Sequence, residues 1–108
     1  MTYLVNTPLL QGITILITGT NRGIGKTSAM LAAEHGARVI CHARAKSDDL
    51  TDTLERVQLH SPSSFAVTAD LRDPQACTEM AALIKAQTSM LNALVCNCLL
   101  YTSDAADE

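Results

Sequence analysis

Short runs of β-branched and apolar residues alternate along the chain with longer segments whose apolar residues recur at helical spacing. The short runs, 13–17, 38–42, 65–68 and 91–96, predict strands, and the segments between them predict helices. A helix between every pair of strands is typical of a parallel sheet, because right-handed crossovers place helices on its faces. The sequence therefore predicts an α/β fold with an incomplete, doubly wound parallel sheet.

Local signals set the expected helix boundaries. Ser47 and Asp73 are good N-cap residues, and Pro74 suits a first helical position. Gly36 follows the first expected helix, where a left-handed C-terminal cap is favoured. The second expected helix should stop before Ser61-Pro62, because a residue that precedes proline avoids helical geometry. One face of the first expected helix, 24–34, should carry Ile24, Ser28, Leu31 and Ala32.

Composition excludes several classes of protein. The 108 residues fit one domain, and a hydrophobic content of 47% excludes an intrinsically disordered chain. Eight Lys or Arg against eleven Asp or Glu give a net charge of −3, which excludes a strongly basic nucleic-acid binder. The N-terminus lacks the layout of a signal peptide, and no apolar run reaches the roughly 18 residues of a membrane span. We therefore expect a cytoplasmic protein that binds neither nucleic acid nor membrane.

The cysteines and histidines predict no metal site. The four cysteines lie in apolar segments and form no C-x-x-C pair, so we expect buried, reduced thiols. The histidines have no spacing typical of a catalytic triad or a metal site, and we expect structural or solvent-exposed roles for them. The residues concerned are Cys41, Cys77, Cys96, Cys98, His35, His42 and His60.

A glycine-rich loop lies between the first expected strand and the first expected helix. Its sequence, from Thr18 to Gly25, is Thr-Gly-Thr-Asn-Arg-Gly-Ile-Gly. Glycines at such a turn allow positive φ angles and let phosphate oxygens approach the backbone, while the helix N-terminus attracts an anion. A P-loop would need a glycine where Thr20 stands, so Lys26 is expected to be a solvated residue. The spacing that fits is G-x-x-x-G-x-G.

With this loop, the chain resembles the short-chain dehydrogenase/reductase family, and in style its 3-oxoacyl-[acyl-carrier-protein] reductase-like members. Segment 36–40 resembles that family's entry to the second strand. Segment 69–71 resembles the family's adenine-contacting residues after the third strand, and segment 91–96 resembles the strand before its Asn-Asn-Ala-Gly motif. The resemblance implies a Rossmann-type domain that binds a nicotinamide dinucleotide, and an intact homo-oligomeric enzyme that acts on a small carbonyl or alcohol. The cofactor-binding residues it implies are Gly19, Thr20, Asn21, Arg22, Gly23, Ile24, Gly25, Arg44, Asp70, Leu71 and Asn97.

The end of the second expected strand favours NADP over NAD. An acidic residue there would accept the ribose hydroxyls of NAD, but this chain has Ala43 followed by Arg44. In related NADP-dependent members, basic residues here and in the glycine loop flank the 2′-phosphate, which Arg44 and Arg22 would hold by forked, charge-assisted hydrogen bonds.

The residues that the family uses for hydride transfer, a Ser and a Tyr-x-x-x-Lys pair, are expected downstream of this chain. Tyr101 is followed four residues later by Ala105 rather than Lys, and Tyr3 precedes the fold, so no catalytic residue is assigned. Residues 1–97 are expected to be the N-terminal part of a cofactor-binding domain. Residues 98–108 resemble a translated sequencing adapter, and we expect a non-native tail.

Two other functions stay open. The same fold could serve a dinucleotide-binding regulator or interaction module without catalysis, because function depends on the site and not on the fold. A P-loop phosphotransferase is a more distant alternative. The downstream sequence discriminates between enzyme and regulator: a Ser with Tyr-x-x-x-Lys supports the enzyme.

Overall fold

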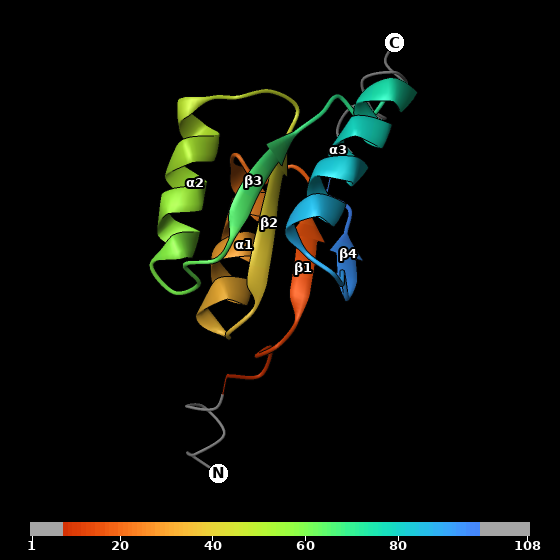
Figure 1. The fold of residues 1–108 in the computed structure, drawn as a ribbon. Coiled ribbons are helices and arrows are strands. Elements are labelled where there is room, and N and C mark those ends of the chain that lie inside the picture. Colours follow the sequence, from red (N-terminus) through yellow and green to blue (C-terminus); the bar gives the residue numbers. More distant parts are fainter. Residues whose placement is uncertain (1–7, 98–108) are drawn as a thin grey trace.

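The computed structural model of the chain describes residues 8–97. Parallel strands form a four-stranded sheet in the order β3-β2-β1-β4, with a helix between each strand and the next along the chain (Figure 1). This is the predicted α/β architecture of the Rossmann type, and its strand order is the one with which dinucleotide-binding sheets of this type begin. The elements are β1 (Thr14–Ile17), α1 (Gly23–Glu34), β2 (Arg38–Ala43), α2 (Asp48–Gln58), β3 (Phe65–Thr68), α3 (Pro74–Gln87) and β4 (Ala93–Val95).

The sheet separates two apolar cores. Helices α1 and α2 cover one face and α3 covers the other, as Figure 1 shows. Side chains alternate along β1, so Ile15 and Ile17 enter the core beneath α1 and α2, whereas Leu16 enters the core beneath α3. This explains why β1 reads as an almost wholly apolar run.

The predicted helix boundaries are largely confirmed. The Ser47 side chain accepts a hydrogen bond from the Leu50 amide at 3.1 Å, and the Asp73 side chain accepts one from the Gln75 amide at 3.0 Å. Gly36 has a φ of 99°, the left-handed region that favours glycine. Helix α2 ends before Ser61-Pro62, as predicted.

The predicted face of α1 is only partly the buried one. Ala32 is buried as part of that face, but Ile24 and Leu31 are 76% and 53% exposed, and the helix also buries Gly25, Ala29 and Ala33. Those small residues also recur at helical spacing, and they let α1 approach the sheet closely. The larger apolar side chains therefore point away from the core.

The last strand is shorter than the expected run 91–96, and it is exposed. β4 covers Ala93–Val95, all exposed, because it pairs only with β1 and forms an edge of the sheet. The expectation of buried thiols holds for Cys41, but Cys77 is only part-buried and Cys96 is exposed. Cys98 lies outside the described residues. Within residues 8–97, no helix has the length and apolar character needed to cross a bilayer.

Candidate nucleotide-binding site

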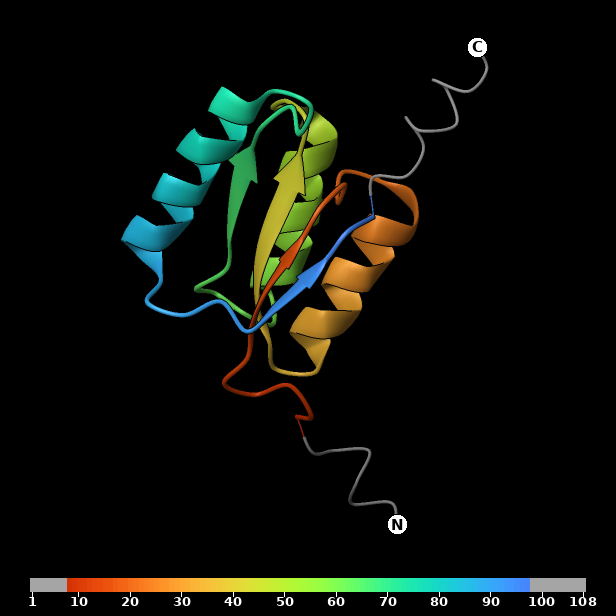
Figure 2. The ribbon, with the colours of Figure 1, turned by 90° about the vertical axis from the view of Figure 1, so that its right-hand side faces the viewer.

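The predicted binding residues gather at one edge of the sheet. Because all the strands are parallel, their carboxyl ends share this edge, and the loops that follow them carry the predicted residues. The chain passes from β3 through α3 on the other face of the sheet to β4, which lies beside β1 (Figure 2). In sheets of this kind, a crevice opens outside the strands where the strand order reverses, here between β1 and β4.

The glycine loop has the backbone geometry that its sequence predicts. Gly19 and Gly23 have φ angles of 68° and 63°, which residues with a side chain rarely adopt. A Cβ atom on Gly25 would overlap the carbonyl oxygen of Gly19 and lie 2.6 Å from Nδ2 of Asn97. Gly25 therefore allows the start of α1 to lie directly against the loop and the end of β4.

The start of α1 presents backbone N–H groups without a side-chain cap. Arg22 is the N-cap residue in extended geometry, and its side chain makes no capping hydrogen bond. The caps of α2 and α3, by contrast, are made by Ser47 and Asp73. The first N–H groups of a helix lack intrahelical acceptors and carry partial positive charge, so this end of α1 can hold an anion.

Hydrogen bonds of Thr18 join the end of β4 to the start of the glycine loop. Its Oγ1 accepts a hydrogen bond from the Asn97 amide at 2.8 Å, and its backbone N–H donates to the Val95 carbonyl at 3.0 Å. Asn97, the last described residue, thereby lies beside Gly25, as its predicted role requires.

A buried histidine joins two loops of the site. The Gly19 amide donates to Nδ1 of His42 at 3.2 Å, and Nε2 of His42 lies 2.9 Å from the Ala69 carbonyl oxygen. The His42 carbonyl also accepts from the backbone and the hydroxyl of Thr20, at 2.8 and 2.9 Å. Burial lowers the pKa of His42, which favours a neutral ring.

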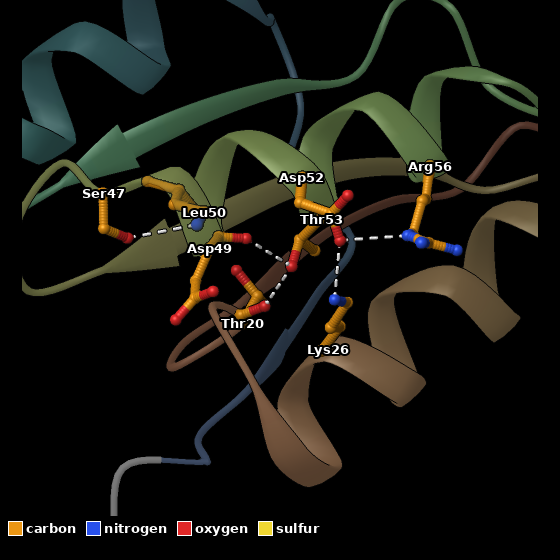
Figure 3. Close-up of polar contacts among 8 residues, drawn as sticks. All are labelled: Thr20, Lys26, Ser47, Asp49, Leu50, Asp52, Thr53 and Arg56. Atoms are coloured by element: carbon orange, nitrogen blue, oxygen red, sulfur yellow. Dashed lines mark hydrogen bonds and ion pairs between the residues drawn. The ribbon is translucent and has the colours of Figure 1, made fainter.

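Helix α2 is also bonded to the glycine loop. The buried Thr53 hydroxyl lies 2.8 Å from the Thr20 carbonyl oxygen and 3.1 Å from that of Asp49 (Figure 3). Lys26 forms an ion pair of 2.7 Å with Asp52, which also pairs with Arg56 at 3.0 Å. The prediction of a solvated Lys26 is therefore wrong: its side chain is only 29% exposed, because it reaches across to α2.

Three charged side chains meet beyond β2 and β3. Both carboxylate oxygens of Asp70 accept hydrogen bonds of 3.0 Å from the Arg72 guanidinium, and Arg44 lies 3.7 Å from the same carboxylate. Hydrogen bonds from Arg72, more than the nearby charge of Arg44, lower the pKa of Asp70 to about 2. Asp70 is therefore ionised at neutral pH, and Leu71 follows it, half-buried against the core beneath α3.

The structure brings the predicted residues together at the sheet edge and adds three that the sequence reading missed as part of the site. Asn21 and Arg22 lie in the loop between Gly19 and Gly23, and the Arg22 side chain is exposed. Sequence reasoning gave His42 only a structural or solvent role, and it assigned no role to Thr53 or Arg72. In the sequence, a role for His42 in the site is indicated by its position at the carboxyl end of an otherwise apolar strand.

Comparison with known proteins shows the family of this chain. The sequence matches the short chain dehydrogenase family over residues 13–107. The chain belongs to this family. It is 35% identical over 96 residues to a WW domain-containing oxidoreductase of Gallus gallus, covering 87% of this chain and 23% of that protein. It is 32% identical over 74 residues to an L-rhamnose 1-dehydrogenase (NAD(P)(+)) of Sphingomonas sp., covering 68% of this chain and 29% of that protein.

Solved structures of other short chain dehydrogenases have the same fold. The oxidoreductase yciK of E. coli superposes with a TM-score of 0.76 at 26% identity, covering 84% of this chain and 38% of that chain. RhlG of Pseudomonas aeruginosa, solved as an NADP active-site complex, gives a TM-score of 0.72 at 32% identity, covering 82% of this chain and 35% of that chain. The chain thus spans about a quarter of these two curated relatives and little more than a third of these two structures.

The described part of the chain assembles no cluster of metal-ligating residues. No three His, Cys, Asp or Glu side chains gather there in a way that could hold a metal ion. Tyr3 and Tyr101, which were considered as catalytic candidates, lie outside the described residues, as does the segment 98–108 with its expected foreign origin.

Proposed function

We propose that this chain is the N-terminal, cofactor-binding part of an NADP-dependent short chain dehydrogenase. The observation that carries the proposal is the junction of Gly19, Gly25 and Asn97, where two glycines and the uncapped start of α1 leave backbone N–H groups accessible at the reversal of strand order. Such a junction suits the pyrophosphate of a dinucleotide. The intact protein would transfer a hydride between the nicotinamide and a small carbonyl or alcohol.

Each part of the dinucleotide has expected partners along this edge. The glycine loop, residues 19–25, would hold the pyrophosphate through the uncapped N–H groups at the start of α1, with Asn97 beside them. Arg22 and Arg44 would flank the 2′-phosphate, and Asp70 with Leu71 would contact the adenine. The NADP preference is supported by the absence of an acidic residue at Ala43, because a carboxylate there would repel the 2′-phosphate. The NADP complex of RhlG is a precedent at 32% identity.

The bound dinucleotide would supply or accept the hydride, and this chain's own residues would bind and orient it. A Ser and a Tyr-x-x-x-Lys pair, expected downstream in the intact protein, would move the proton. We further propose a homo-oligomeric cytoplasmic enzyme, similar to 3-oxoacyl-[acyl-carrier-protein] reductases. Residues 98–108 would be read-through, a proposal that fails if the genomic locus encodes the same residues.

The test is the affinity of the 108-residue chain for NADP and NAD, measured by isothermal titration calorimetry. The chain should bind NADP more tightly than NAD. Arg44→Ala should weaken NADP binding by about tenfold and leave NAD binding nearly unchanged, because it removes a charged hydrogen bond to the 2′-phosphate.

Lys85→Ala is the matched control, because Lys85 is an exposed cation in the last turn of α3, at the opposite end of the sheet. It should leave both affinities unchanged. Equal or tighter binding of NAD by the unmodified chain would refute the NADP preference. Failure to bind either dinucleotide would refute the site itself.

A further inference from the structure

His42 lies at the carboxyl end of β2, with only 1% of its surface exposed, and the proposed function assigns it no contact with the dinucleotide. We propose that His42 is a positioning residue: its ring fixes the glycine loop in the conformation that receives the pyrophosphate and joins that loop to the adenine-side loop after β3. The proposal rests on the proposed dinucleotide site.

The two hydrogen bonds of the His42 ring determine its protonation state and its tautomer. The Gly19 amide can only donate, so Nδ1, at 3.2 Å, must be an unprotonated acceptor. The Ala69 carbonyl oxygen can only accept, so Nε2, at 2.9 Å, must carry the hydrogen. The geometry therefore requires the neutral Nε2–H form of the ring. Burial, which lowers the pKa of His42, favours the same neutral state.

Within the glycine loop, Gly19 is the residue whose hydrogen bond to His42 most affects the conformation of the loop. Its φ of 68° sets the direction of the turn, and its carbonyl oxygen occupies the space where a side chain of Gly25 would lie. The Thr20 amide is bonded to the carbonyl of the same histidine at 2.8 Å. Two successive loop amides are therefore held by one residue of β2, and neither N–H is left to turn toward a ligand or toward solvent.

The other ring nitrogen, Nε2, is hydrogen-bonded to the loop that follows β3. Ala69 directly precedes Asp70 and Leu71, the residues expected at the adenine. One imidazole thus joins the glycine loop to the loop that carries the residues expected at the adenine. Any buried ring nitrogen needs a hydrogen-bond partner, but the partners of His42 lie in the two loops of the proposed site.

Two substitutions separate positioning from packing. In His42→Asn the side-chain oxygen lies near the place of Nδ1, so the acceptor for the Gly19 amide is kept and the bond to Ala69 is lost. In His42→Gln the terminal amide nitrogen lies near the place of Nε2, so the donor to Ala69 is kept and the Gly19 acceptor is lost. Each variant loses one bond and the same aromatic ring, so both should lower stability to a similar extent.

Dinucleotide affinity should differ between the two variants. We expect His42→Asn to bind NADP within about threefold of the unmodified chain, and His42→Gln to bind about tenfold more weakly, because a buried amide is left without an acceptor at the pyrophosphate loop. Isothermal titration calorimetry on the 108-residue chain measures both. Equal affinity losses in the two variants would show that the ring acts through packing alone and would overturn the proposal.

A measurement without ligand keeps this inference separate from the proposed function. A long-range ¹H–¹⁵N spectrum of the unmodified chain should show His42 unprotonated at Nδ1 and protonated at Nε2, and the Gly19 amide resonance should move in His42→Gln but not in His42→Asn. A protonated Nδ1 would overturn the positioning role even if NADP binds. If these spectra are as expected but NADP does not bind the unmodified chain, the proposed function fails and the attachment of the loop by His42 stands.

Discussion

At the scale of single residues, the site depends on a glycine whose lack of a side chain lets two segments lie in contact. Gly25 has no side chain where the Gly19 carbonyl and the Asn97 amide approach it. The first turn of α1 can therefore lie against both the loop after β1 and the end of β4. This close approach brings the N–H groups of the helix to the point where the strand order reverses.

Gly25→Ala should disrupt this junction. The added methyl group overlaps backbone that cannot move without displacing the loop, so we expect a loss of about 1–3 kcal/mol in the free energy of unfolding. Dinucleotide binding should fall below detection. Urea denaturation and calorimetric titration measure the two effects.

Gly12→Ala is the control for this substitution. Gly12 has a φ of 86° and nothing within 4 Å of the added Cβ, so the cost is backbone strain of about 1–2 kcal/mol. Affinity for the dinucleotide should not change, because Gly12 precedes β1 at the opposite edge of the sheet. A Gly25→Ala variant that still binds NADP normally would contradict the close-approach argument.

A second prediction at the residue scale concerns the charge of Asp70. The hydrogen bonds that hold the pKa of Asp70 at about 2 come from the side chain and from the backbone N–H of Arg72. Because Arg72→Ala removes only the side-chain bonds, it should raise that pKa part of the way toward the ordinary value of 3.8. Carboxyl ¹³C NMR during an acid titration measures it. Arg44→Ala should raise the same pKa less, since the Arg44 contribution is the smallest.

The sign of the accompanying stability change follows from the lowered pKa. Asp70 stabilises the fold fully above the unfolded-state pKa near 3.8, and this contribution is lost as the pH falls toward 2. Arg72→Ala should reduce that acid dependence without abolishing it, because the backbone N–H of residue 72 still donates to Asp70. An unchanged pKa in Arg72→Ala would show that Arg72 does not hold the carboxylate.

At the scale of elements, α2 supports the glycine loop from one side. The Thr53 hydroxyl is buried and reaches the Thr20 carbonyl oxygen, while the ion pair of Lys26 and Asp52 joins α1 to α2. The loop is therefore held between β2, through His42, and α2, through Thr53.

Thr53→Val keeps the shape of the side chain and removes its hydroxyl. The Thr20 carbonyl then loses a buried donor, so we expect a loss of about 1–2 kcal/mol in stability and a severalfold weaker affinity for the dinucleotide. Thr51→Val is the matched control on the same helix, because its hydroxyl is exposed and bonds only the Ser47 carbonyl at 3.2 Å. Equal effects of the two substitutions on affinity would contradict a link from α2 to the loop.

The type and order of the elements could be predicted because each signal was local. Ser47, Asp73 and Gly36 act within a few residues of their own positions, and all three have the predicted roles. The buried face of α1 could not be predicted in full, because its small residues matter through close approach to the sheet. The shorter length of β4 likewise depends on its pairing with β1, which apolar character alone does not reveal.

At the scale of the whole molecule, the parallel sheet explains why scattered residues form one site. Residues 19–25, 44, 70–71 and 97 each follow the carboxyl end of a strand, so a correct topology was enough to place them together. The links made by His42, Thr53 and Arg72 depend on side-chain geometry, and no spacing of residues predicts them. The exposed β4 predicts association with another chain, because an unpaired strand edge is prone to pairing.

A map of the residues that NADP contacts is the decisive test of the proposed dinucleotide-binding site. Titration of the ¹⁵N-labelled 108-residue chain with NADP should shift the amide resonances of residues 19–25, 44, 70–71 and 97 saturably, with one affinity. Resonances at the opposite edge of the sheet, such as those of Gly12 and Lys85, should stay in place. Saturable shifts centred elsewhere, or no shifts at all, would contradict the assignment of this edge as a dinucleotide-binding site.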